Sequence, residues 1–364
     1  MLAMVHLGVV AGCSSSPPPC ESGPAGTLCG IAGTGELAFI KDGLPAQATA
    51  FYLPSEMRRG PDGLLYIMDF NNMRLRRISA DGTVETVAGD GFHAGATEGA
   101  VATESSLENP IDFAFLPDGR IALISYHDPR VLVIDNDGTL VKIAGNAQPG
   151  IRGFEGDGGD ANLAQFFRLA GIAVGPDGAV YLADDSANRV RVIRGGIITT
   201  FAGTGRSTYT GDGGPATAAT LFAPTALAID GANNVYIADA GNHAIRKVTS
   251  AGTITTIAGT GVKGYSGDGG PAIAAQLAAP DGVAVGTDGT VFVSDRLNSV
   301  IRKITVDGTI RTIVGTGARG NTGDNGPALA AELGYPSRIQ LDTDGSLLIA
   351  DQTNSCVRAV VAPL

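Results

Sequence analysis

Histidine and cysteine are scarce in this chain of 364 residues, with four of each. His6 lies in an apolar N-terminal segment, and His93, His127 and His243 fall in three different parts of the chain. A zinc centre needs three or four ligands at one point, so we expect no convergence of these histidines and predict no metal-ligating residues. The chain also lacks a G-x-S-x-G motif and a Cys–His nucleophile pattern. We therefore assign no catalytic residue.

Positive charge is in deficit. The chain has 25 lysine and arginine residues against 36 aspartate and glutamate residues, a net charge of −11. Without a basic patch to contact phosphates, nucleic acid is excluded as a partner. We interpret the acidity as a device for solubility and expect no cofactor. Calcium is the alternative, because acidic surfaces attract cations.

Long apolar runs are absent too, and the apolar stretch 1–13 is too short to span a bilayer. Its end, V-A-G-C, resembles a bacterial lipobox, although no lysine or arginine precedes the run. The resemblance implies a signal segment at 1–13, lipidation of Cys13, a Ser/Pro-rich tether at 14–26, and export to the bacterial cell envelope. The membrane is then contacted through the lipid anchor alone. The alternative is a cytosolic protein whose start is apolar by chance.

Glycine, in contrast, is abundant, and it recurs at fixed places. The chain holds 53 glycines, and the ending (I/V)-(A/V)-G recurs at intervals of 56 or 58 residues. Its glycines are Gly33, Gly89, Gly145, Gly203, Gly259 and Gly315. Six copies at one period indicate a repeat architecture rather than a flexible linker.

Each unit divides into four short strands. In the fifth unit the pattern predicts strands at 281–286, 290–294, 299–305 and 309–314, with Asp-Gly turns after the first and the third. Asp-Gly between apolar runs is a strong hairpin signal because glycine tolerates a positive φ. Six units of four antiparallel strands predict an all-β, six-bladed β-propeller at 27–364.

The two ends of the repeat complement each other. Residues 27–33 match the last strand of a unit, whereas 337–361 contain the first three strands and then stop. We therefore expect the N-terminal strand to complete the last blade and close the ring, which removes exposed sheet edges.

The second and third strands of each unit resemble the NHL repeat, (I/V)-A-D-x-x-N-x-x-I-R-(K/R)-(I/V). The fullest copy is A-D-A-G-N-H-A-I-R-K-V at 238–248. The third unit keeps the aspartate and arginine, but its asparagine has moved to Asn188. The second unit departs most, with Ser125 at the aspartate position and Leu132 at the arginine position. The resemblance covers roughly 27–361 and implies an NHL-type propeller.

One face of the propeller should carry the D-x-x-N turns and the long G-D-G-G-P-A connections, and the opposite face only short turns. The first face then holds a ring of aspartates at positions 69, 184, 239, 295 and 351. Such a ring could hold a hard cation. We favour a structural interpretation, in which these side chains cap turns and pair with third-strand arginines.

Departures from the repeat are better candidates for a specific site. The second unit and the connection after it carry aromatic and charged residues on the long-loop face. We predict that this patch binds a ligand through Tyr126, His127, Asp128, Arg130, Phe154 and Glu155. The alternative is that the second unit has simply drifted.

Three cysteines remain if Cys13 carries lipid. Hairpin register sets Cys29 opposite Val360, so Cys29 and Cys356 lie four residues apart along the ladder, roughly 13 Å. This separation exceeds disulfide reach. We therefore predict a bridge between Cys20 and Cys29 and a free thiol at Cys356.

These observations predict a monomeric, non-enzymatic binding scaffold of the bacterial cell envelope that recognises a protein or glycan on the Asp-rich face. The alternative is a calcium-dependent, lactonase-like hydrolase or lyase on the same propeller.

Overall fold

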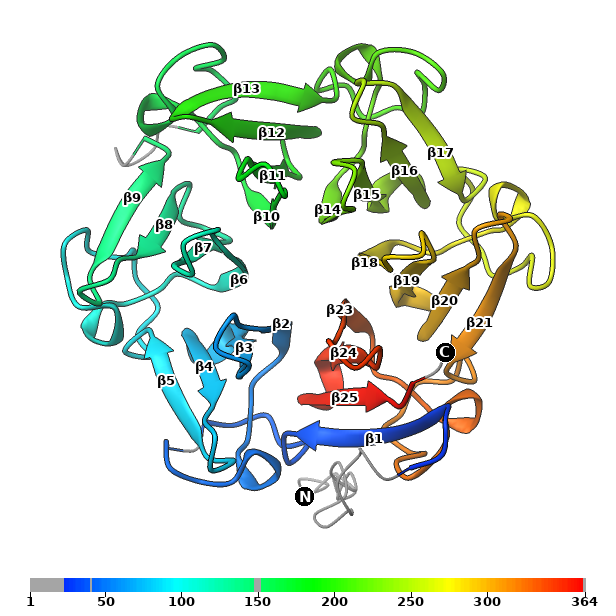
Figure 1. Ribbon diagram of the computed structural model, residues 1–364, viewed down its shortest axis with the longest axis horizontal. Coiled ribbons are helices and arrows are strands. Elements are labelled where there is room, and N and C mark those ends of the chain that lie inside the picture. The colour runs from blue at the N-terminus through cyan, green and yellow to red at the C-terminus, as the bar shows by residue number, and fades with distance from the viewer. Residues whose placement is uncertain (1–22, 40, 147–151, 363–364) are drawn as a thin grey trace, which may run out of the picture.

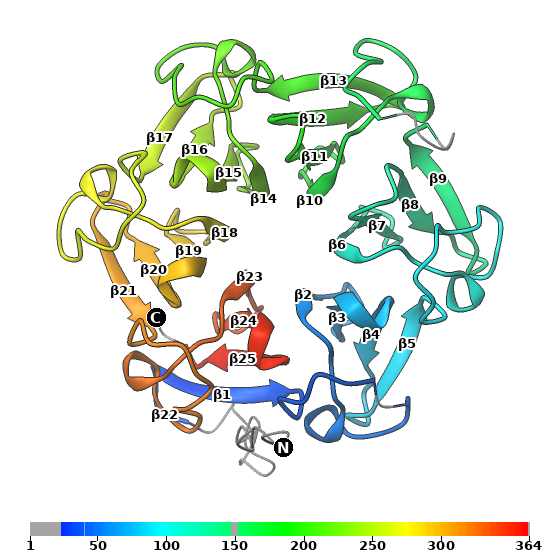
Figure 2. The same ribbon diagram turned by 180° about the vertical axis from the view of Figure 1, so that it is seen from behind.

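Six four-stranded blades surround a central axis in the computed structural model, which describes residues 23–39, 41–146 and 152–362 (Figure 1). Within each blade the strands run antiparallel, and the first strand lies nearest the centre. Seen from behind, the same six inner strands face one another across the axis (Figure 2). The predicted all-β, six-bladed architecture is confirmed.

The strands follow in chain order within each blade. Blades one to three contain β2 (Pro54–Arg59), β3 (Leu65–Asp69), β4 (Arg74–Ile78), β5 (Val84–Ala88), β6 (Pro110–Phe115), β7 (Ile121–Ser125), β8 (Val131–Ile134), β9 (Leu140–Ala144), β10 (Leu169–Val174), β11 (Val180–Asp184), β12 (Arg189–Arg194) and β13 (Ile197–Ala202). Blades four to six contain β14 (Pro224–Ile229), β15 (Val235–Asp239), β16 (Ala244–Val248), β17 (Ile254–Ala258), β18 (Pro280–Val285), β19 (Val291–Asp295), β20 (Val300–Ile304), β21 (Ile310–Val314), β23 (Pro336–Leu341), β24 (Leu347–Asp351) and β25 (Cys356–Val360).

Helical structure among the described residues is limited to single 3₁₀ turns. They are η2 (Ala46–Ala48), η3 (Phe70–Asn72), η4 (Ala102–Glu104), η5 (Ala161–Leu163), η6 (Ala216–Ala218), η7 (Ala240–Asn242), η8 (Ala272–Ala274), η9 (Arg296–Asn298), η10 (Ala328–Ala330) and η11 (Gln352–Asn354). None of these could cross a membrane.

The N-terminal strand closes the ring, as predicted. Strand β1 (Thr27–Ala32) pairs with β25 on one side and with the short β22 (Gly326–Pro327) on the other, so the sixth sheet reads β22-β1-β25-β24-β23. Leu28 and Ala32 of β1 are buried. Residues 1–22, including Cys13 and Cys20, lie outside the described residues, so the signal segment, lipidation and most of the tether stay predictions.

The cysteine predictions need one correction. Strand β1 pairs Cys29 with Ala359 rather than Val360, because the ladder contains a bulge between Gly30 and Ala32. Cys29 and Cys356 therefore remain three residues out of register, too far apart for a bridge between them. No cysteine among the described residues is free, so the prediction of a free Cys356 thiol is wrong. The Cys20–Cys29 bridge involves an undescribed residue and stays a prediction.

The recurring glycines end each unit because no other residue fits there. Their φ angles lie between 93° and 104°. A Cβ on Gly259 would lie 2.3 Å from the backbone oxygen of His243, and one on Gly33 would lie 2.6 Å from that of Ser355. The outermost strand thus approaches the preceding turn closely, and this contact fixes the period seen in the sequence.

A buried ionic strut repeats in the blades. In blade four, the Asp239 carboxylate accepts hydrogen bonds from the backbone N–H of Phe222 (2.7 Å) and from Asn242 Nδ2 (2.8 Å). The fully buried Arg246 guanidinium lies 3.3 Å from Asp239 and donates to Asp212 of the long connection at 2.6 Å. In blade four the strut ties the second strand, the third strand and the incoming connection together.

Four other blades carry the same arginine and connection aspartate, and in each the arginine follows the aspartate by 34 positions. These pairs are Arg76–Asp42, Arg191–Asp157, Arg302–Asp268 and Arg358–Asp324. The aspartates of the predicted ring are buried within these blades, and burial raises the pKa of Asp69, Asp184, Asp239 and Asp295 to about 6 each. The predicted pairing with third-strand arginines is confirmed for Asp69, Asp239, Asp295 and Asp351. Asp184 instead accepts hydrogen bonds from three backbone N–H groups.

Blade two lacks the strut. Ser125 and Leu132 occupy the aspartate and arginine positions, and both are buried. Leu132 packs into an apolar cluster with Leu75, Leu107 and Leu123. Apolar contact thus replaces the buried ion pair in this blade.

Candidate functional site

Polar side chains of the inner strands β2, β6, β18 and β23 meet in the central channel. Arg338 of β23 extends across the axis and is only 5% exposed. Its guanidinium donates to the backbone oxygens of Ala170 (2.6 Å) and Thr225 (2.7 Å) and to the Asp281 carboxylate (3.1 Å). One side chain of blade six thereby joins blades three, four and five and forms a floor across the channel.

A second polar layer is formed by β2 and β6. Arg58 Nη2 donates to Glu56 at 3.3 Å, to Asp112 at 3.2 Å and to the backbone oxygen of Ile172 at 3.3 Å. Glu56 is completely buried and also accepts from Gln340 Nε2 at 3.3 Å. Burial is the largest cause that raises the pKa of Glu56, to about 8, and the neighbouring Asp112 adds to the effect. Glu56 therefore holds its proton at neutral pH.

Replacing Glu56 by glutamine should stabilise the protein progressively as the pH rises. Folded Glu56 keeps its proton up to about pH 8, whereas its ordinary pKa is 4.5. The folded state then holds the extra proton between these values, so wild-type stability falls as the pH rises through this window. The variant lacks this loss, and the difference in unfolding free energy should grow by up to about 1.4 kcal/mol per pH unit.

Urea unfolding of wild type and Glu56→Gln at pH 5, 6, 7 and 8 measures this difference. The exposed Glu98 provides the matched control, Glu98→Gln, which should follow the wild type at every pH. Parallel curves for wild type and Glu56→Gln would contradict the assignment of a protonated Glu56.

A pocket of about 370 Å³ opens above the Arg338 floor, on the face that carries the turns between second and third strands. Its wall includes Phe70, Tyr126, Asp185, Arg296 and Gln352, which follow directly after the second strand in five different blades. All five occupy one position of the repeat, yet each blade supplies a different side chain. This variation is what a specific binding site requires.

Two aromatic rings form one side of the pocket. The rings of Phe70 and Tyr126 meet edge to face, with centroids 6.4 Å apart. The guanidinium of Arg168 lies 4.6 Å from the centroid of the Tyr126 ring and forms a two-point ion pair with Asp185. Tyr126 is held in place by these contacts, and its hydroxyl makes no hydrogen bond with any residue that the structure describes.

The opposite side of the pocket is polar. Arg296 Nη2 donates to Gln352 Oε1 at 3.0 Å, and Arg296 Nε lies 3.5 Å from Asp281. The lining contains two aspartates and two arginines. Their charges balance, so the site favours a neutral ligand that can both donate and accept hydrogen bonds.

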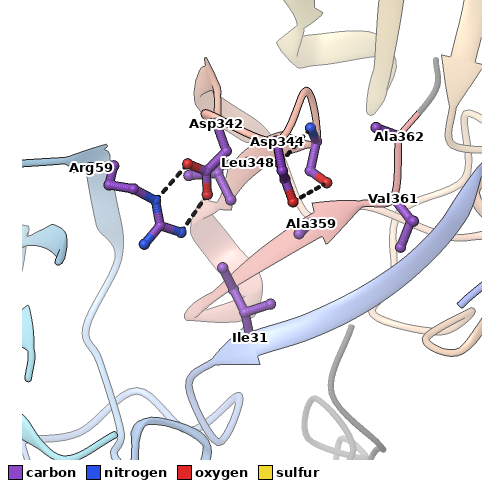
Figure 3. Close-up of a pocket in the computed structure, with 9 residues that line it drawn as sticks. Ile31, Arg59, Asp342, Asp344, Leu348, Ala359, Val361 and Ala362 are labelled. Carbon is purple, nitrogen blue, oxygen red and sulfur yellow. Dashed lines mark hydrogen bonds and ion pairs between the residues drawn. The ribbon is translucent and has the colours of Figure 1, made fainter. Parts of the chain in front are cut away.

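The opposite face, which carries the short turns, also contains hollows. One, of about 270 Å³, lies beside β1 and β25, where Arg59 forms a two-point ion pair with Asp342 across the closing seam (Figure 3). Another, of about 560 Å³, lies between the turns of blades five and six. Their carboxylates cap turns, as Asp288 does for Thr290. We interpret these hollows as spaces between hairpin turns.

The predicted binding residues are placed in three different settings. Tyr126 lines the central pocket, and His127 is exposed beside it. Asp128 and Arg130 form an ion pair with 2.7 Å between Arg130 Nε and the carboxylate, and Arg130 also ties down the backbone of Ala96. Phe154 and Glu155 are exposed in the connection to blade three, where Phe154 stacks on Arg189, 3.9 Å from the ring centroid.

Two of the three described histidines lie close together. His93 and His127 belong to different segments of the chain, but their ring centroids lie 6.1 Å apart. His93 comes from the connection that leads into blade two, which folds back over the β7–β8 turn that carries His127. His243 lies in the equivalent turn of blade four and accepts a hydrogen bond from Ala279 N–H.

Most of the pocket was missed from the sequence. The position directly after the repeat's aspartate holds Asp185, Arg296 and Gln352 in three of the units. This position differs from unit to unit, whereas the scaffold positions around it repeat. Comparing it across the units would have marked these residues as candidates for a site. Arg338 carries the same kind of signal, because the corresponding residues of the other inner strands are Glu56, Asp112, Gly171, Ala226 and Gly282.

Comparison with known proteins places this fold. The Teneurin NHL domain family matches residues 261–322, a range that contains the four strands of blade five. The SUPPRESSOR OF QUENCHING 1 protein of Arabidopsis thaliana is 29% identical over 268 residues, 66% of this chain and 24% of the plant protein. Teneurin-m of Drosophila melanogaster is 27% identical over 347 residues, 85% of this chain and 12% of the teneurin. The chain thus spans a quarter or less of these relatives.

Solved structures share the architecture at low sequence identity. An auxiliary nutrient binding protein from Bacteroides thetaiotaomicron has a TM-score of 0.64 and 16% identity, over 92% of this chain and 76% of its own. A virginiamycin B lyase from Staphylococcus aureus has a TM-score of 0.51 and 13% identity, over 88% of this chain and 99% of its own. These likenesses establish the fold alone. The chain is thus a six-bladed β-propeller, and one of its blades matches the Teneurin NHL domain family.

Proposed function

We propose that the protein is a binding scaffold that holds a small neutral glycan in the pocket above Arg338, at the bacterial cell envelope as the sequence predicts. The observation that carries this proposal is the convergence of five different side chains, one from each of five blades, at a single position of the repeat. Structural residues repeat from blade to blade, whereas these do not.

The chemistry of the wall supports a sugar. Phe70 and Tyr126 offer apolar ring surface, and Arg296, Gln352 and Asp185 offer donors and acceptors around it. A sugar ring presents apolar C–H groups on its faces and hydroxyls at its edge, so it can use both. The balanced charge of the lining disfavours a phosphate or another strongly charged ligand.

The fold supports binding as well. The auxiliary nutrient binding protein shows that a propeller of this shape serves a binding role in another protein. Propellers host many unrelated functions, so the pocket residues carry the proposal and the likeness adds to it.

Calorimetric titration of the full chain with a panel of neutral mono- and disaccharides tests the proposal. Tyr126→Ala should weaken binding of the sugar that binds wild type by roughly tenfold, because it removes about 1–2 kcal/mol of aromatic contact. Gln352→Ala should weaken it by a smaller factor, since one hydrogen bond contributes about 1 kcal/mol.

Phe154→Ala is the matched control. Phe154 is an exposed aromatic outside the pocket, so this variant should bind as wild type does. Equal losses in Tyr126→Ala and Phe154→Ala would place recognition on the wider patch predicted from the sequence. The absence of binding by any neutral sugar would reject the glycan proposal.

A further inference from the structure

A second cluster with ligand chemistry lies beside the central pocket. One potential ligand atom from each of His93, Glu108 and His127 lies within 4.8 Å of the others. His93 belongs to the connection from β5 to β6, Glu108 precedes β6 closely, and His127 belongs to the β7–β8 turn. The connection into blade two and the β7–β8 turn therefore meet at this point.

Asn109 holds the two histidine rings toward that point. Its Oδ1 lies 2.6 Å from His93 Nε2 and 3.2 Å from His127 Nδ1. Asn109 is itself fixed, because it is 9% exposed and its backbone N–H donates to the sulfur of Met73. Two ring nitrogens that face one oxygen are already oriented toward a shared centre.

The donor set selects a class of metal. Two imidazole nitrogens and one carboxylate oxygen suit zinc and similar divalent transition metals, which these groups bind at about 2.0–2.2 Å. Calcium and magnesium prefer oxygen ligands alone. The amide oxygen of Asn109 or a water molecule would complete a tetrahedral set.

A metal ion in this cluster would link two parts of blade two. In five blades an arginine–aspartate strut ties the incoming connection to the blade, and blade two has Ser125 and Leu132 in its place. The cluster links the connection into blade two with the β7–β8 turn of the same blade. We propose that His93, Glu108 and His127 bind one zinc ion, which fastens this connection where the ionic strut is missing.

Zinc titration of the tag-free full chain tests the proposal. Zinc chloride should raise the melting temperature of wild type by roughly 3 °C or more, as expected when a ligand binds the folded state alone. Calcium or magnesium chloride should not. Cobalt(II) should give the visible absorption of a four-coordinate site, with one equivalent bound.

His93→Ala and His127→Ala should each abolish both the zinc shift and the cobalt spectrum. His243→Asn is the matched control, because asparagine keeps an acceptor for Ala279 N–H and tolerates the positive φ of this position. It should respond as wild type does. Unchanged zinc binding in His93→Ala, His127→Ala or the double variant would overturn the proposal, as would a wild type that gains no stability and no cobalt spectrum. Sugar binding is measured separately, so failure here leaves the glycan proposal standing.

Discussion

Replacing Arg302 by leucine should lower the free energy of unfolding by about 3–5 kcal/mol, the effect expected when one partner of a buried ion pair is removed. Arg302 is fully buried between Asp295, at 3.4 Å, and Asp268, at 2.6 Å. Without it, Asp295 remains buried beside Asn298 and loses its counter-charge. Burial already raises the pKa of Asp295 to about 6, so the variant should take up a proton there at neutral pH.

Blade two supplies the compensating change. It carries Ser125 and Leu132 where blade five carries Asp295 and Arg302. The double variant Asp295→Ser/Arg302→Leu copies this pair, removes the stranded carboxylate and should recover at least about 1 kcal/mol relative to Arg302→Leu.

Chemical unfolding of the two variants and of Arg120→Leu measures these effects. Arg120 pairs with Asp118 and Asp135 at the surface, so its replacement should change stability by less than about 1 kcal/mol. If Arg302→Leu were as mild as Arg120→Leu, the strut would contribute little to stability. If the double variant were less stable than Arg302→Leu, the explanation of blade two would be wrong.

Deleting residues 1–32 should abolish cooperative folding of the ring. The deletion removes β1, whose Leu28 is completely buried, and exposes the edge of β25. Truncating a single buried leucine to alanine costs about 2–5 kcal/mol, and typical total stability is about 5–15 kcal/mol. The open edge should also promote association between chains.

Deletion of residues 1–22 is the control, because it retains all of β1. The full chain and both deletions are compared in reducing buffer, since residues 1–22 include Cys20, the predicted partner of Cys29. This shorter deletion should melt in a single transition at the temperature of the full chain. The longer deletion should show a broad transition and larger species in size-exclusion chromatography. A synthetic peptide of residues 23–33 added in trans should reduce both changes. A sharp, unshifted transition after deletion of residues 1–32 would show that the ring does not depend on β1.

The sequence predicted the scaffold in detail because scaffold residues repeat. Each end of strands β18 to β21 lies within one residue of its predicted position. The structure also explains why the asparagine of the third unit is displaced. Asn188 adopts the left-handed backbone conformation, with φ 52°, that His243 and Ser299 adopt at the same place in their blades. Asparagine tolerates this conformation better than most residues.

The candidate site could not be predicted in the same way. Residues such as Tyr126, Asp185 and Arg296 lie more than 50 residues apart in the chain and meet only because the ring closes. Residues that are close in the sequence point to different places. Tyr126 lines the pocket, whereas Asp128 pairs with Arg130. The residues predicted as one patch are therefore divided in the structure among the pocket, the histidine cluster and an ion pair.

The closing seam also bears on how the protein is made. Cys29 and its partner Ala359 are separated by 330 residues. At a synthesis rate of about 5–20 residues per second, β1 leaves the ribosome about 15–65 s before its partner strand exists. Strand β1 can therefore join its sheet only after β25 has been made, and a chain that stops before β25 cannot complete the sixth blade. Until then β1 is an unpaired strand, and such an edge is prone to pair with other chains.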